Sequence, residues 1–109
     1  MLSSRIKKAW LEELKSEVEK LHAEYVTLDE EKNKLGERIA VLEELQATWE
    51  QRGPKVAPHL LEEGAKELQN MKEELDTVEK TVREKRSRLQ FVEVLKRNVE
   101  RQVEKEEDD

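Results

Sequence analysis

The sequence predicts an all-α protein, a long two-helix antiparallel coiled-coil hairpin. Three features of the chain predict this fold. Apolar residues recur at alternating spacings of three and four through both halves, Gly and Pro cluster in one central stretch, and the phase of the apolar pattern changes across that stretch. Of the 109 residues, 35% are hydrophobic and 44% are charged, which suits helices with a narrow apolar stripe better than a thick globular core.

The first helix is expected over residues 4–52. Its apolar stripe has leucine at every seventh position from Leu14 to Leu42 and contains two polar residues, Lys32 and Gln46. A heptad pattern of this length predicts a coiled-coil helix. It also argues against disorder, which the high charge alone would permit.

The second helix is expected over residues 58–104, and its apolar stripe follows a new frame. Residues 105–109 form an acidic tail that is expected to be frayed and solvated. The second stripe consists of Leu61, Gly64, Leu68, Met71, Leu75, Val78, Val82, Lys85, Leu89, Val92, Lys96, Val99 and Val103.

A turn is expected over residues 53–57. Gly53 stands where a left-handed residue would end the first helix, and Pro54 prevents the helix from continuing. Pro58 suits the first turn of the second helix, where its missing amide hydrogen has no consequence. The chemistry of this stretch therefore predicts that the chain folds back on itself.

A chain that folds back at its middle brings together stripe residues whose numbers sum to about 110. Leu42 is then expected opposite Leu68, and Leu21 opposite Leu89. Near the turn, the large Trp49 and the small Gly64 are expected to compensate in size. The alternative is a parallel dimer in which two chains zip together along their leucines.

Residues 1–109 are thus expected to form a single hairpin domain, which dimerisation would convert into a four-helix bundle. The chain has no Cys, and its two histidines, His22 and His59, lie too far apart to share a metal ion on one helix face. A two-helix rod also offers no enclosed pocket to shift the pKa of a carboxyl group. We therefore expect no metal, no cofactor and no enzymatic activity.

Charge and hydropathy also restrict location and partners. No apolar run is long enough to cross a bilayer, and the first residues lack the apolar core of a secretory signal. A cytoplasmic location is expected, with the nucleus as the alternative. The net charge of −6 argues against a general nucleic-acid binder, which normally carries a basic field.

The most basic stretch of the chain lies within the second helix. It would contact RNA, acidic lipid headgroups or an acidic protein, or else it pairs with Glu24, Asp29 and Glu30 across the hairpin. We favour pairing, because no aromatic residues are interleaved for stacking on bases. The basic residues are Lys80, Arg83, Lys85, Arg86 and Arg88.

Several large apolar residues fall outside the two stripes, toward the open end of the hairpin. A contiguous apolar patch of this kind usually marks an interface, and Trp is the residue type most often found as its anchor. These candidate partner-binding residues are Ile6, Trp10, Phe91, Val94 and Leu95. A smaller candidate near the turn combines Val41 and Leu45 with Leu60.

The stretch LEELQATWEQRGPKVAPHLLEEGAKELQNMKEELDTVEKTV, residues 42–82, resembles the HR1-type hairpins of Rho-family GTPase effectors and membrane-bending adaptor proteins. In both, an aromatic residue precedes a short Pro-containing turn and an amphipathic return helix. The position of EGAKEL directly after the turn departs from that pattern. The resemblance implies an antiparallel hairpin that binds a small GTPase.

The function expected from these patterns is a non-catalytic protein–protein interaction module that serves as a scaffold, spacer or adaptor in a cytoskeletal, trafficking or signalling assembly. We expect it to form a homo-oligomer. The alternatives are a Rho-family GTPase effector hairpin, and a stalk of a larger assembly that contacts RNA or acidic membrane through its basic residues.

Overall fold

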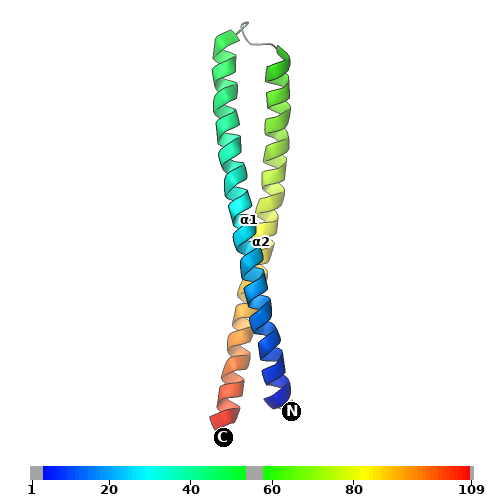
Figure 1. Ribbon diagram of the computed structural model, residues 1–109, viewed down its shortest axis with the longest axis vertical. Coiled ribbons are helices and arrows are strands. Elements are labelled where there is room, and N and C mark those ends of the chain that lie inside the picture. Colours follow the sequence, from blue (N-terminus) through cyan, green and yellow to red (C-terminus); the bar gives the residue numbers. More distant parts are fainter. Residues whose placement is uncertain (1–3, 54–57, 109) are drawn as a thin grey trace. The chain divides into compact units, whose positions relative to one another are not determined.

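The computed structural model describes residues 4–53 and 58–108 (Figure 1). These residues form helix α1, Ser4–Arg52, and helix α2, Pro58–Asp108, which run in opposite directions and include no strand. The all-α antiparallel hairpin predicted from the heptads is confirmed. Both helices contribute to each of two compact units: unit 1 joins Met1–Thr27 with Val82–Asp109, and unit 2 is Leu28–Thr81.

The core of unit 1 is built from the two apolar stripes. Leucines of α1 pack against leucine and valines of α2, and Val92 is fully buried. Val18 and Leu95 are partly buried against this core. The buried residues of this core cluster are Leu11, Leu14, Leu21, Leu89, Val92, Val99 and Val103.

Ion pairs between the helices of unit 1 lie at the expected register. Arg88 Nη2 lies 3.1 Å from Glu17 Oε1, and Lys85 Nζ lies 2.8 Å from Glu24 Oε2. The residue numbers in each pair sum to about 110, as expected for antiparallel coiled-coil packing. Because such pairs select orientation more than they add stability, they favour this register over a shifted one.

The buried residues of unit 2 include one polar side chain, that of Gln46. Leu35 and Ile39 are buried, and so are Gln46 of α1 and Gly64 of α2. The side chain of Gln46 occupies the space beside Gly64. The prediction that Trp49 compensates for the small size of Gly64 is therefore wrong. Gln46, not Trp49, fills the space that the absent side chain of Gly64 leaves.

The end of α1 and the start of α2 agree with the local sequence. Gly53 has φ of +60°, the left-handed conformation that glycine adopts without strain. Pro58 is the first residue of α2. The rest of the expected turn, including Pro54, lies outside the described residues.

The second helix is longer than expected. It continues to Asp108 through residues that were expected to form a frayed tail. Here Lys7 of α1 pairs with Glu106, and Lys8 Nζ lies 2.6 Å from Glu107 Oε1. These pairs place lysines of α1 beside the acidic residues at the end of α2 and reduce the repulsion among those residues.

Candidate functional site

Large apolar side chains are exposed on unit 1. Ile6, Trp10, Phe91 and Val94 are each between 42% and 56% exposed. Leu95 is half-buried, because part of its side chain packs on the core. The structure thus leaves most of the predicted interface residues available at the surface.

Heptad positions show which of these residues share one face. With Leu11 at position a of α1 and Leu61 at position a of α2, Trp10 and Leu95 occupy g positions. Position g of one helix flanks the same side of the seam as position g of an antiparallel partner, and position c lies next to g on each helix. The ion pair between the g residues Glu17 and Arg88 shows this arrangement directly.

Ile6 and Phe91 occupy c positions, so they lie on the same side as Trp10 and Leu95. We call these four residues the g-side apolar face. Val94 is at position f, which points away from the seam, so it lies at the margin of this face rather than within it. Of the five partner-binding residues predicted from the sequence, four therefore share this face.

Arg88 connects the charged and apolar parts of this face. Its guanidinium donates a hydrogen bond to Glu17 Oε1 at 3.1 Å and lies 5.5 Å from the centroid of the Phe91 ring. Both contacts restrict the exposed aromatic ring and its neighbour to a defined arrangement. In the sequence, Arg88 belongs to the most basic stretch of the chain. Its g position opposite Glu17 was the signal for this other role.

The opposite side of unit 1 is polar. Among the described residues, positions e and b there carry charged or hydrogen-bonding side chains, with Val26 as the one large apolar exception. The apolar surface of unit 1 is therefore one-sided. The e residues on this side are Lys8, Lys15, His22, Arg86, Glu93, Glu100 and Glu107.

The predicted basic patch is partly neutralised. Lys85 is half-buried and donates a hydrogen bond to Glu24 Oε2 at 2.8 Å, while Arg88 is paired with Glu17. Lys80 belongs to unit 2, and the other four basic residues belong to unit 1. Of those four, Arg83 and Arg86 are exposed and have no ion pair with any described residue; Lys80 of unit 2 shares both properties.

The hydrogen bond from Lys85 lowers the pKa of Glu24 below its ordinary value of 4.5, and the positive charges of Lys85 and Lys20 act in the same direction. Two of the five basic residues, Lys85 and Arg88, thus pair with α1, which is the arrangement that the sequence favours for this stretch.

His22 and His59 are both exposed. Within residues 4–53 and 58–108, no group of three or more His, Asp or Glu side chains is arranged to hold a metal ion. Neither described helix has a segment long and apolar enough to cross a membrane.

No family model, curated protein or solved structure matches this chain. The observations that bear on function are therefore the hairpin itself and the surfaces that it displays. The HR1-type hairpin remains a hypothesis that rests on residues 42–82.

Proposed function

We propose that this chain is a non-catalytic protein–protein interaction module that self-associates through its g-side apolar face and acts as a scaffold or adaptor. The observation that carries the proposal is the grouping of Ile6, Trp10, Phe91 and Leu95 on one side of unit 1, opposite a polar side. Burial of such a one-sided face removes apolar surface from water, which is the main driving force of association.

A second copy of the chain is a suitable partner for this face. Glu17 and Arg88 on this side already neutralise each other within the chain. The charged residues at c positions of unit 1 are balanced in sign: Glu13, Lys20, Glu84 and Lys105. Two such faces can therefore approach without net like-charge repulsion. Packing of two hairpins in this way gives a four-helix bundle.

Sedimentation equilibrium over a range of protein concentrations tests this proposal. We expect the wild-type chain to have at least the mass of a dimer, and the variant Trp10→Ala/Leu95→Ala to have the mass of a monomer. Because Leu95 also packs on the core, Trp10→Ala/Phe91→Ala provides a second test in which both altered side chains are exposed.

Circular dichroism at 222 nm should show that both variants keep their helicity. The matched control is His22→Ala/Val26→Ala, which truncates two exposed side chains on the opposite side of unit 1 and should leave the mass unchanged. The proposal fails if the wild-type chain is a monomer at every concentration, or if the two face variants retain the wild-type mass.

A further inference from the structure

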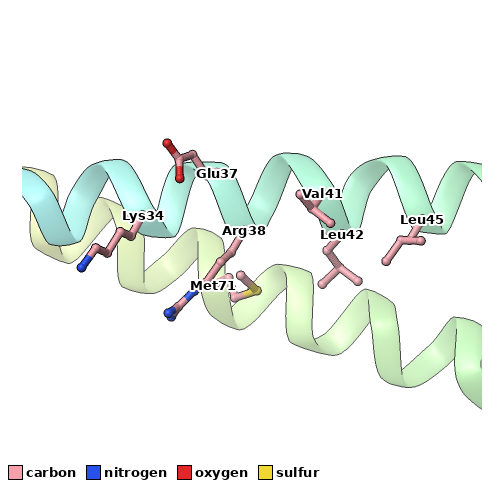
Figure 2. A pocket seen from close by; sticks show the side chains of 7 residues that line it. All are labelled: Lys34, Glu37, Arg38, Val41, Leu42, Leu45 and Met71. Carbon is pink, nitrogen blue, oxygen red and sulfur yellow. The ribbon is translucent and has the colours of Figure 1, made fainter.

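A groove between the helices of unit 2 is separate from the g-side apolar face. It has a volume of about 530 Å³ and lies on the side of α1 that carries positions c and g. Its apolar part includes Val41, which is 57% exposed, and Leu45, which is 42% exposed. The groove is lined by Lys34, Glu37, Arg38, Val41, Leu42, Leu45 and Met71 (Figure 2).

One end of the groove is cationic. Figure 2 shows Lys34 and Arg38 extending on the side of Met71, whereas Glu37 points away from α2. Lys34 and Arg38 have no ion pair with any residue that the structure describes. By contrast, Lys32 pairs with Asp29 at 3.1 Å and Lys72 with Glu43 at 3.6 Å within the same unit.

Carboxylates limit the kind of anion that this end accepts. Glu31 and Glu74 line a smaller pocket together with Lys34 and Arg38. An extended polyanion, such as nucleic acid or an anionic membrane, would meet these carboxylates as well as the cations. Individual carboxylates next to an apolar segment fit better, because they contact the cations and leave Glu31 and Glu74 in water.

We propose that this groove binds an acidic amphipathic helix of a partner protein. Two large apolar side chains of the partner, spaced i and i+3 or i+4, pack on Val41, Leu45 and Met71, as in other helix-in-groove complexes. Its carboxylates face Lys34 and Arg38. The centres of the apolar pair and the cationic pair of α1 are about 10 Å apart, so the partner's carboxylates lie about two turns from its apolar pair.

A second copy of this chain satisfies only part of this requirement. On this side of unit 2, α1 presents Val41 and Leu45 beside cations, and α2 presents Glu67 and Glu74 with Leu60 as its one exposed large apolar residue among those described. Neither helix of unit 2 presents an apolar pair with carboxylates two turns away. In unit 1, Ile6 and Trp10 with Glu13 and Glu17 have this spacing. Those apolar residues belong to the g-side apolar face, which the proposed self-association already covers, and Glu17 is paired with Arg88. A different protein is therefore the better occupant.

Selection from a displayed library of helical peptides, randomised on one face, tests the proposal with the full chain as bait. We expect the enriched peptides to carry an apolar pair and carboxylates about two turns apart. A selected peptide should bind Lys34→Glu/Arg38→Glu at least tenfold more weakly than the wild-type chain. The same peptide with its carboxylates changed to lysine should prefer that charge-reversed variant.

The matched control is Lys66→Glu/Lys80→Glu, which reverses two exposed charges at outward f positions of unit 2 and should leave peptide affinity unchanged. The proposal is overturned if no peptide is enriched, if enriched peptides lack carboxylates, or if charge reversal does not change the preference. Two other results also overturn it. If Lys34→Glu/Arg38→Glu changes the oligomeric mass and the control variant does not, the groove binds a second copy of the chain. If the chain binds phosphatidylserine vesicles and this binding requires Lys34 and Arg38, the groove binds a lipid surface. Trp10 and Phe91 are unchanged throughout, so failure here is distinguishable from failure of self-association.

Discussion

Gln46 of α1 fills the space that Gly64 of α2 leaves open. A Cβ atom placed on Gly64 would lie 2.6 Å from Gln46 Nε2, and that nitrogen donates a hydrogen bond to the main-chain oxygen of Leu61 at 3.2 Å. Gln46 Oε1 is buried and has no hydrogen-bond partner among the described atoms. Only one register of the two helices places Gln46 beside Gly64. The contact therefore fixes the position of α1 against α2 in unit 2.

Substitution with alanine should affect stability differently at the two helical glycines, Gly36 and Gly64. A Cβ on Gly36 meets nothing within 4 Å, so Gly36→Ala should raise the free energy of unfolding by about 1 kcal/mol through helix propensity. In Gly64→Ala, the same gain is offset by the displacement of Gln46, and we expect no increase or a decrease. Urea denaturation measures both.

The background variant Gln46→Ala serves as the control for Gly64. There the added methyl group has room, so Gly64→Ala should recover the stabilisation of about 1 kcal/mol. A similar gain for Gly64→Ala in the wild-type chain would contradict the contact with Gln46.

Replacement of Gln46 with an apolar residue of similar length should stabilise unit 2. Gln46→Met removes a buried oxygen without a partner, a feature that costs about 1–3 kcal/mol, and keeps an unbranched side chain beside Gly64. We expect the free energy of unfolding to rise by about 1 kcal/mol. The control is Gln90→Met, which changes an exposed residue and should have little effect on stability. A loss of stability in Gln46→Met would show that the hydrogen bond to Leu61 contributes more than the unpaired oxygen costs.

The ion pair between Glu24 and Lys85 should make stability depend on pH. Because the pKa of Glu24 is lowered in the folded chain, its contribution is present above 4.5 and is lost as the pH falls through the lower, folded value. The difference in unfolding free energy between wild type and Glu24→Gln should therefore be largest above pH 4.5 and shrink in more acidic solution.

Thermal denaturation at a series of pH values measures this difference. Lys85→Met is the matched background, since without the hydrogen-bond donor Glu24→Gln should lose its pH-dependent effect. A difference that stays constant with pH in the wild-type background would argue against the lowered pKa.

Two valines of α2 allow a buried position to be compared with an exposed one. Val92 is 0% exposed, so Val92→Ala should lower the free energy of unfolding by about 2 kcal/mol, from the lost methyl groups and the cavity left behind. Val94 is 52% exposed, and Val94→Ala should leave stability within about 0.5 kcal/mol. Equal effects in chemical denaturation would show that the α2 stripe does not follow the heptad frame.

The helices and their pairing were predictable from the sequence because both depend on short-range, periodic patterns. The leucine repeats indicated the buried side of α1, and Gly53 and Pro58 indicated where the helices end and begin. The last residues of α2 were mispredicted because their charge alone was considered, whereas Glu106 and Glu107 pair with Lys7 and Lys8 at the other end of the chain.

The candidate surfaces were only partly predictable. Ile6, Trp10, Phe91 and Leu95 stood out as apolar residues outside the stripes, but their common side depends on how two antiparallel helices place their g and c positions. The pairing of Arg88 with both Glu17 and Phe91 likewise requires side chains from different helices and different turns.

By itself, the sequence determined that the chain forms two amphipathic helices and where they are interrupted, since heptad spacing and Gly-Pro chemistry act locally. It favoured antiparallel pairing over a parallel dimer. Only the tertiary structure decided that Gln46 occupies the space beside Gly64, that Lys34 and Arg38 adjoin an apolar groove, and that one side of unit 1 is apolar. Those features depend on the packing of side chains from two helices against each other, which no periodicity within one helix specifies.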